Sequence, residues 1–155
     1  MNHNSVMREI RRMAALLVAA LVAVAAEAQV ARMTGSWDTV DDKTGEKRGR
    51  VEIYRAADGM YYGRMTGAYA RRPDGTYALL TELPAPYDKV IGSDILRALQ
   101  VDGDQLKGYC YDPESGNTYY GKVRYDAVTG KLTLRGSVDR WGLLGRSQTW
   151  VRSGK

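Results

Sequence analysis

Four acidic side chains near expected turns are the first candidates for chemistry. They are Asp41, Asp42, Asp112 and Glu114. Carboxylates can bind a hard cation, and a suitably spaced pair can cleave a glycoside. The run that begins at Asp112 resembles a calcium loop, but its twelfth position, where such a loop needs Glu, is Val123. Because a hairpin turn also explains the Asp residues, we favour turns and expect no metal site.

The histidine and cysteine content excludes the commonest catalytic arrangements. The only histidine, His3, lies in a segment that we expect to be removed, so the mature chain would have none. This excludes Ser-His-Asp and Cys-His catalysis that uses a histidine base, and it removes the commonest ligand of transition metals. The single Cys110 cannot form an internal disulfide. We therefore expect a protein that is not an enzyme and has no cofactor.

Aromatic side chains are a further group of candidates, since the chain has 11 Tyr and 3 Trp but no Phe. Tyrosine joins a flat apolar ring to a polar tip, which suits a partly wet pocket and equally suits the rim of a small β-barrel. The apolar stretch Trp141–Gly145 could be a lid, a lipid contact or a plug, and we favour the plug. The candidate ligand-binding residues are Tyr54, Tyr62, Tyr119, Trp141 and Leu143.

Residues 1–28 read as a signal peptide. Three Arg precede the apolar run Met13–Ala26, and the small-x-small pattern Ala26-Glu27-Ala28 follows. The alternative is a membrane anchor, but the run of 14 residues is shorter than the ~20 that cross a bilayer. We predict cleavage after Ala28, a periplasmic or secreted location, and a single domain formed by residues 29–155.

The mature chain is mildly basic, because loss of three Arg and two Glu leaves a net charge of +4. Its basic residues are scattered among acidic ones, which is typical of solvated strand faces and not of a nucleic-acid stripe. We expect no nucleic-acid partner, and we keep a peripheral contact with the cell envelope open.

A turn pattern that recurs three times organises the mature chain. Each copy reads Asp-x-x-(Ser/Thr)-Gly, in which Asp accepts hydrogen bonds from turn amides and Gly adopts the positive φ that closes a hairpin. The three copies are Asp41–Gly45, Asp112–Gly116 and Asp126–Gly130. Asp112 and Gly116 are therefore assigned structural roles.

Runs with strand-like composition lie between the turn signals, and most alternate apolar with polar residues. They are Thr34–Val40, Arg48–Arg55, Met60–Thr66, Thr76–Glu82, Ile95–Val101, Gln105–Tyr111, Thr118–Tyr125, Lys131–Val138 and Arg146–Arg152. This predicts an all-β fold, a small antiparallel up-and-down barrel of eight or nine strands in which the first strand pairs with the last. Within Leu83–Leu99, two Pro break any strand, and Ser93 could cap a helical turn instead.

The first strand carries a pair of residues that face the same side. Gly35 and Trp37 lie two apart, and the missing side chain at Gly35 leaves room for a bulky neighbour. We expect Trp37 to plug one end of the barrel.

A set of short motifs along the mature chain resembles the bacterial family of exported proteins catalogued as domain of unknown function 2147. The motifs are Gly35-Ser36-Trp37, Asp41-Asp42-x-x-Gly45, Val51-x-Ile53-Tyr54, Tyr62-Gly63, Ile91-Gly92, Tyr111–Tyr119, Leu134-Arg135-Gly136 and Leu144–Trp150. The resemblance implies a lipocalin-like barrel, in which an arginine near the chain end, Arg152 or Arg146, stacks on Trp37 as a structural pair. Many members carry two cysteines after the third strand, whereas Gly67–Leu83 has none.

The resemblance brings no known activity, so the function has to be argued from the residues. The leading hypothesis is a periplasmic barrel whose interior binds a small apolar or amphipathic molecule, since barrels of this size either fill with side chains or hold one ligand. The alternative is a structural or interaction protein of the cell envelope with a filled barrel. An interior cavity of ~300 Å³ or more would favour the ligand.

Overall fold

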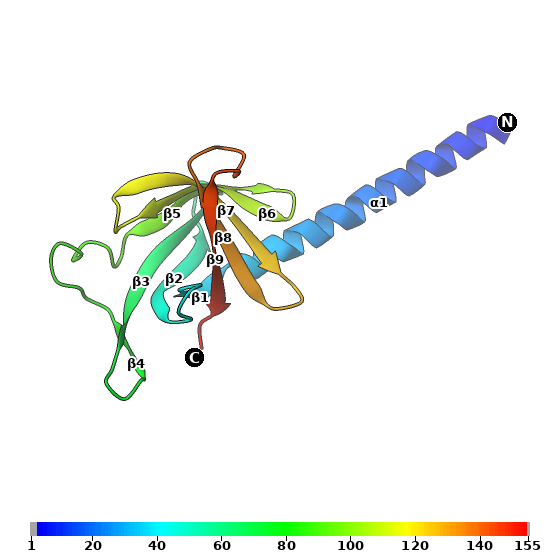
Figure 1. The fold of residues 1–155 in the computed structure, drawn as a ribbon. Helices are drawn as coiled ribbons and strands as arrows, with labels where there is room; N and C mark the ends of the chain where they lie inside the picture. Colours follow the sequence, from blue (N-terminus) through cyan, green and yellow to red (C-terminus); the bar gives the residue numbers. More distant parts are fainter. Residues whose placement is uncertain (1–2, 155) are drawn as a thin grey trace.

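The computed structural model describes residues 3–154, which form one long helix followed by nine strands (Figure 1). The helix α1 comprises His3–Met33. The strands are β1 (Gly35–Val40), β2 (Lys47–Arg55), β3 (Tyr61–Arg71), β4 (Tyr77–Leu80), β5 (Asp94–Asp102), β6 (Gln105–Asp112), β7 (Asn117–Asp126), β8 (Lys131–Ser137) and β9 (Gly145–Arg152).

Eight of the strands close into an antiparallel up-and-down barrel, which confirms the predicted fold class. The strands follow the order β2-β1-β9-β8-β7-β6-β5-β3 around the wall, and the pairing of β2 with β3 closes the ring. Strand β1 pairs with β9, with Trp37 opposite Arg152, so the first and last strands meet as predicted. The ninth strand, β4, lies outside the ring and pairs with an extension of β3 that runs past Thr66 to Arg71.

Side chains fill the interior of the barrel. On β2, Val51 and Ile53 are buried while Glu52 between them is exposed, which is the period-two pattern of a barrel wall. Trp37 and Trp150 are the largest core side chains and are at most 1% exposed. The core also contains Val51, Ile53, Ile95, Leu96, Leu99, Leu106, Cys110, Val123 and Leu132. A barrel of eight strands is narrow enough to be packed in this way.

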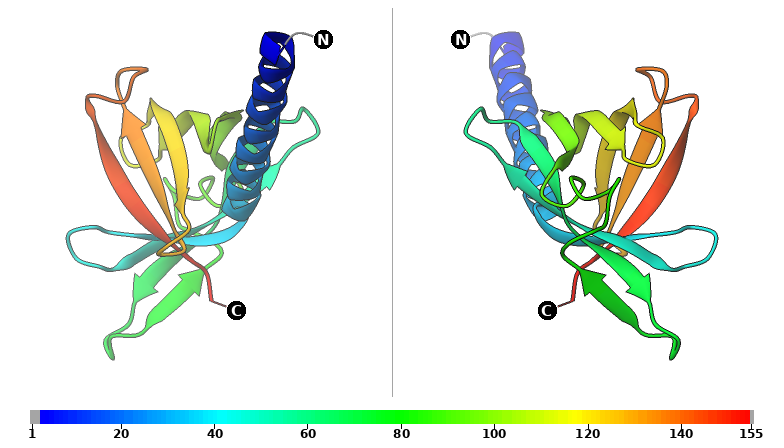
Figure 2. Two further views of the ribbon diagram at one scale, coloured as in Figure 1. Left: turned by 90° about the vertical axis from the view of Figure 1, so that its right-hand side faces the viewer. Right: turned by 90° about the vertical axis from the view of Figure 1, so that its left-hand side faces the viewer.

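The last turn of α1 closes one end of the barrel. Val30 and Met33 are buried in the core, and the indole Nε1 of Trp37 donates a hydrogen bond of 2.9 Å to the Met33 carbonyl. The rest of α1 projects away from the barrel (Figure 1), and Figure 2 shows the barrel from the side to which the helix points and from the opposite side. It contains an apolar stretch long enough to cross a membrane, a property that signal sequences share. The helix is consistent with the predicted signal peptide, and cleavage after Ala28 stays a prediction.

The three recurring turns have the hydrogen bonds expected from their sequences. In the β6–β7 turn, the Asp112 carboxylate accepts bonds from the Glu114 N–H and the Ser115 hydroxyl, and Gly116 has a φ of 71°. The β1–β2 and β7–β8 turns repeat this arrangement around Asp41 and Asp126. These carboxylates are engaged in forming turns, which agrees with the interpretation favoured over a cation site.

The segment from residue 83 to residue 93 contains no strand, as Pro84 and Pro86 predicted. It is a loop of turns, and strand β5 begins directly after it at Asp94. The hydroxyl of Ser93 donates 2.7 Å to the Val90 carbonyl, which closes a turn. The predicted alternative of a helix capped by Ser93 is therefore wrong.

Strand β5 contains an irregularity that a glycine on the next strand permits. Ala98 has a φ of +50°, and the register between β5 and β6 shifts around it. A Cβ on Gly108 of β6 would lie 2.6 Å from the Ala98 carbonyl oxygen. The backbone of β5 can bulge here only because β6 has no side chain at this position.

Candidate functional site

The closed end of the barrel is built around Trp37 and Arg152. The Arg152 guanidinium carbon lies 3.8 Å from the centroid of the Trp37 ring. Its two terminal nitrogens donate to the carbonyls of Thr34, at 2.8 Å, and Arg32, at 2.7 Å. Gly35 has a φ of +106°, and a Cβ there would lie 2.9 Å from the guanidinium. Gly35 therefore makes room for Arg152, not for Trp37, and the pair has the geometry of a structural closure.

Tyr54 and Tyr62 lie outside the barrel wall, so the expectation that they line an interior pocket is corrected. Their rings stack with centroids 6.0 Å apart. The Tyr54 hydroxyl donates to Asp94 at 3.0 Å and accepts from Arg64 at 2.8 Å. The Tyr62 hydroxyl donates to Asp58 at 2.6 Å. The polar tips of both tyrosines are therefore engaged by neighbouring charged side chains.

The other three candidate ligand residues lie in two further places. Tyr119 packs against the core from inside the wall. Trp141 and Leu143 lie in the loop between β8 and β9, where they are 70% and 77% exposed. The prediction that this loop folds under the barrel as a plug is wrong, since its apolar side chains face the solvent. The structure does not bring the five residues together.

Cys110 and the carboxylates offer no reactive cluster. Burial raises the pKa of the Cys110 thiol to about 11, so the thiol stays protonated. Hydrogen bonds from the Thr44 amide and Arg48 lower the pKa of the Asp41 carboxyl to about 2. Within residues 3–154, no three His, Cys, Asp or Glu side chains are grouped closely enough to hold a metal ion.

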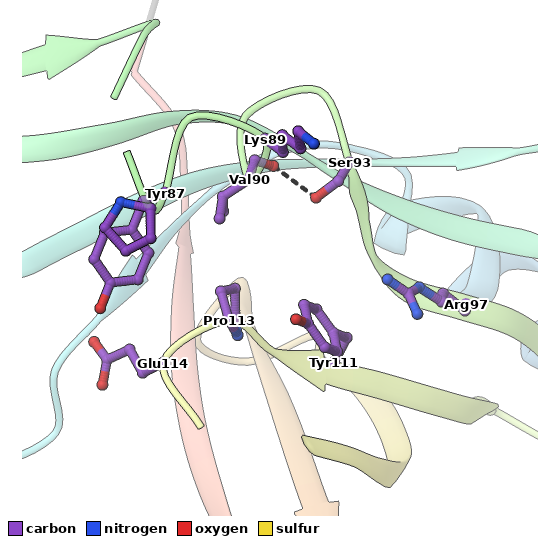
Figure 3. Close-up of a pocket in the computed structure, with 9 residues that line it drawn as sticks. Tyr87, Lys89, Val90, Ser93, Arg97, Tyr111, Pro113 and Glu114 are labelled. Carbon is purple, nitrogen blue, oxygen red and sulfur yellow. Dashed lines mark hydrogen bonds between the residues drawn. The ribbon is translucent and has the colours of Figure 1, made fainter. Parts of the chain in front are cut away.

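A groove of about 390 Å³ lies on the outside of the barrel, between the 81–93 loop and the end of β6 (Figure 3). Its lining combines rings and apolar side chains with a few charged groups. The residues are Pro86, Tyr87, Lys89, Val90, Ser93, Arg97, Tyr111, Pro113 and Glu114. The Arg97 guanidinium lies 4.7 Å from the centroid of the Tyr111 ring, and its Nε donates 2.7 Å to the Asp94 carbonyl. The cation is thus held over the ring at one side of the groove.

A second hollow of about 390 Å³ lies on the outer face of β5, β6 and β7. The rings of Tyr109 and Tyr120 are opposite each other across β6 and β7, with centroids 5.7 Å apart. Three cationic side chains line the same hollow, from Lys107, Lys122 and Arg140. The outer wall of the barrel therefore presents rings and cations together.

The structure also contains a buried charge that the sequence analysis missed. Asp38 of β1 has no exposed surface, and its carboxylate accepts hydrogen bonds from Lys47, Arg50, Tyr69 and Ser153 at 2.7–3.0 Å. Burial alone would raise the pKa of Asp38, but the four donors outweigh it and lower the pKa to about 2. The cluster joins three strands and the chain end outside the barrel wall.

The groove residues Tyr87, Val90, Arg97 and Tyr111 were also missed by sequence reasoning. Arg97 lies opposite Tyr109 in the register of β5 and β6, close enough to cover Tyr111 two residues further along. An arginine at the start of β5 and a tyrosine before the Asp112 turn were the available signals. These two residues become informative only once the register between β5 and β6 is known.

The comparisons with known proteins bear on the family and the fold. A family described as an uncharacterized protein conserved in bacteria, DUF2147, matches residues 35–152. The chain is also similar in structure to protein HP1028 from the human pathogen Helicobacter pylori, which is described as belonging to the lipocalin family. The two chains share 21% identity with a TM-score of 0.57, over 79% of this chain and 84% of that one.

The likeness to HP1028 supports a lipocalin-like fold and nothing about what is bound. No curated protein matches the chain. The family match covers every strand of the barrel, from Gly35 to Arg152. The chain therefore belongs to the bacterial family of domain of unknown function 2147.

Proposed function

We propose that this protein is an exported binding protein of the cell envelope, and that it binds a small amphipathic molecule in the groove on the outside of the barrel. The proposal rests on the combination of apolar surfaces and charged groups in this groove. The barrel interior, in contrast, is packed with side chains. The proposed binding site is therefore the groove on the outside of the barrel, and not the interior, where the sequence analysis expected it. Export is supported by the apolar α1 and by the Ala26-Glu27-Ala28 pattern.

The lining of the groove indicates the chemistry of the ligand. Tyr87, Val90 and Pro113 offer apolar surface, and Tyr111 adds a ring already covered on one side by Arg97. The volume of the groove falls in the range of ~300–1,000 Å³ typical of small-molecule sites. Two cations, Lys89 and Arg97, and one carboxylate, Glu114, line the groove, so a ligand with an apolar body and one anionic group would meet a lining with a net positive charge. No covalent step is part of the proposal, and the groove is not proposed as a catalytic site.

The groove can be tested with the amphipathic dye 8-anilinonaphthalene-1-sulfonate, which has an aromatic body and one sulfonate. The dye is titrated into the isotope-labelled protein, and amide chemical shifts are followed by NMR. We expect the amides of Val90, Ser93 and Tyr111 to shift first. Tyr111→Ala should weaken this binding about tenfold, because the ring supplies much of the apolar contact.

Tyr109→Ala is the matched control for this experiment. Tyr109 lies on the same strand and the same outer face, but it does not line the groove. Its substitution should leave the affinity of the groove unchanged. The proposal fails if the dye shifts amides elsewhere and leaves those of the groove in place, or if both variants bind equally well.

The filled interior also favours the alternative function, a protein that works through its outer surface as an interaction protein of the envelope. Met33, Trp37 and Leu96 have no exposed surface, and the other buried core side chains are at most 9% exposed. A mass-spectrometric search for proteins crosslinked to the partly exposed Lys107 in intact cells tests this alternative. A reproducible partner would support it, and the absence of any partner would contradict it.

A further inference from the structure

We propose that the loop Val138–Leu144, between β8 and β9, docks this protein on the surface of an anionic phospholipid bilayer. The proposal concerns a different surface from the groove and does not depend on it. It starts from an unusual concentration of exposed apolar side chains. Val138, Trp141, Leu143 and Leu144 are 65%, 70%, 77% and 68% exposed. Elsewhere in the described barrel, apolar side chains more than half exposed occur singly, at Val101 and Val128.

The loop is held in one shape while its apolar side chains point outward. The carboxylate of Asp139 accepts hydrogen bonds from the amides of Leu143, at 3.0 Å, and Leu144, at 2.7 Å. The Val138 amide donates 3.0 Å to the Leu144 carbonyl, which closes the base of the loop. Gly142 adopts a φ of 80° at the tip. The loop therefore presents its apolar side chains without having to reorganise.

Cations of the barrel wall satisfy the carbonyls of the loop. Lys122 of β7 donates 2.6 Å to the Trp141 carbonyl, and Arg135 of β8 donates to the carbonyls of Gly142, at 2.6 Å, and Leu143, at 3.2 Å. Unpaired backbone groups are costly to move into lipid, where water cannot bond them. All four carbonyls from Trp141 to Leu144 already have partners, so this cost is largely removed from the tip of the loop.

The charged side chains near the loop indicate which kind of bilayer the loop would bind. The loop and the strand ends beside it carry four cations, from Lys122, Arg135, Arg140 and Arg146, and one carboxylate, Asp139, which accepts hydrogen bonds from loop amides. Within residues 3–154, none of these four cations makes a salt bridge. Cations of this kind are attracted to the negative surface of an anionic leaflet. An exposed apolar loop with an excess of cations in and beside it fits such a surface better than it fits a neutral one.

The adjoining outer wall extends the same surface. Arg140 and Lys122 also line the hollow that contains Tyr109 and Tyr120, whose side chains are 47% and 38% exposed. Tyr and Trp are enriched where a protein meets the headgroup layer, because their rings are apolar and their tips are polar. The hollow is therefore placed to face the phosphate groups of lipids next to the inserted loop.

The test uses tryptophan emission from the protein recovered from the envelope of expressing cells, in whatever form the cells process it. Of the three tryptophans, Trp37 and Trp150 are at most 1% exposed, so Trp141 reports contact with solvent or lipid. Helix α1 contains no tryptophan, so a retained helix that binds lipid does not by itself give the signal. The probes are vesicles of phosphatidylcholine, with or without phosphatidylglycerol, whose acyl chains carry bromine as a quencher.

We expect vesicles with phosphatidylglycerol to shift the emission to the blue and bromine to quench it, with weaker binding as salt is raised. Leu143→Ser with Leu144→Ser should reduce vesicle affinity at least tenfold, since each leucine loses its transfer into lipid. Val128→Ser is the matched control. It removes an exposed apolar side chain at the opposite end of β8, and it should bind as the parent does.

The proposal is overturned if Trp141 is not quenched by any vesicle, or if the double variant is quenched as strongly as the parent. A blue shift that grows with protein concentration in the absence of lipid would mean that a second copy of the chain covers the loop, which also contradicts the proposal. The substituted side chains are exposed, so thermal unfolding should show both variants folded.

Discussion

The guanidinium carbon of Arg152 lies 3.8 Å from the centroid of the Trp37 ring, and the same guanidinium donates hydrogen bonds to two carbonyls at the end of α1. One residue thus ties the last strand, the first strand and the helix together. The indole below it also bonds to Met33, so the closed end of the barrel depends on a few interlocked side chains.

Trp37→Ala should lower the free energy of unfolding by ~3–5 kcal/mol, because it empties a large and fully buried site. Arg152→Ala should cost less, about 1–2 kcal/mol, since it removes a cation over a ring and two hydrogen bonds to carbonyls. The double variant should be less destabilised than the sum of the two, because the side chains touch. Urea unfolding of the four proteins measures all three values.

Trp141→Ala is the matched control for these variants. Its side chain is 70% exposed, so its loss should change the free energy of unfolding by less than about 0.5 kcal/mol. A loss of under about 1 kcal/mol for Trp37→Ala would contradict the assignment of Trp37 to the core.

Asp38 makes the free energy of unfolding depend on pH in the acid range. The pKa of Asp38 is about 2 in the folded protein, against an ordinary value of 3.8. As the pH falls, the unfolded chain therefore takes up a proton at Asp38 at a higher pH than the folded protein does. The resulting stabilisation, about 2 kcal/mol, is present above pH ~4 and is lost as the pH falls from ~4 to ~2. The measurement is the difference in unfolding free energy between the parent and Asp38→Asn at a series of pH values.

At neutral pH, Asp38→Asn should cost about 2–3 kcal/mol, because Lys47 and Arg50 then lack their counter-charge in a partly buried place. The difference from the parent should shrink through the acid range. Asp41→Asn is a comparison, and its difference from the parent should also shrink in acid, because hydrogen bonds in an exposed turn lower the pKa of Asp41 to about 2 as well. A pH profile of Asp38→Asn that runs parallel to that of the parent would contradict the prediction.

The parts of the fold that the sequence predicted depend on local chemistry. The turn at Asp112 could be predicted because the aspartate and Gly116 act within one hairpin, and strands such as β2 show their alternation directly. The pairing of β1 with β9 was predicted because unpaired strand edges are unfavourable, and no single residue indicated it.

The parts that the sequence could not predict depend on distant residues. Asp38 is buried because Tyr69, from the extended end of β3, and Ser153, after the last strand, both cover it. The groove forms between two segments that are separate in the sequence, because Tyr87 and Val90 lie in the 81–93 loop and Tyr111 lies at the end of β6. The exposure of Trp141 could not be predicted either, because an apolar loop has the same kind of sequence whether it folds under a barrel or faces the solvent.

The last prediction concerns the end of α1, where the structure makes the position of cleavage matter. Cleavage after Ala28 would leave Gln29–Met33 attached to the barrel, so Val30 and Met33 would keep their buried places and Met33 its bond to Trp37. A cut after Met33 would remove these core side chains. In the uncut helix, the Gln29 side-chain oxygen is buried and has no hydrogen-bond partner among residues 3–154.

We therefore expect intact-mass measurement of protein from the periplasm to give a chain that begins at Gln29. The control is Ala28→Phe, which replaces the small residue that the processing site requires and should leave the longer chain in the membrane fraction. A chain that begins after Met33 would contradict the assignment of Val30 to the core of the mature barrel, and an uncut chain recovered from the parent would contradict the predicted signal peptide.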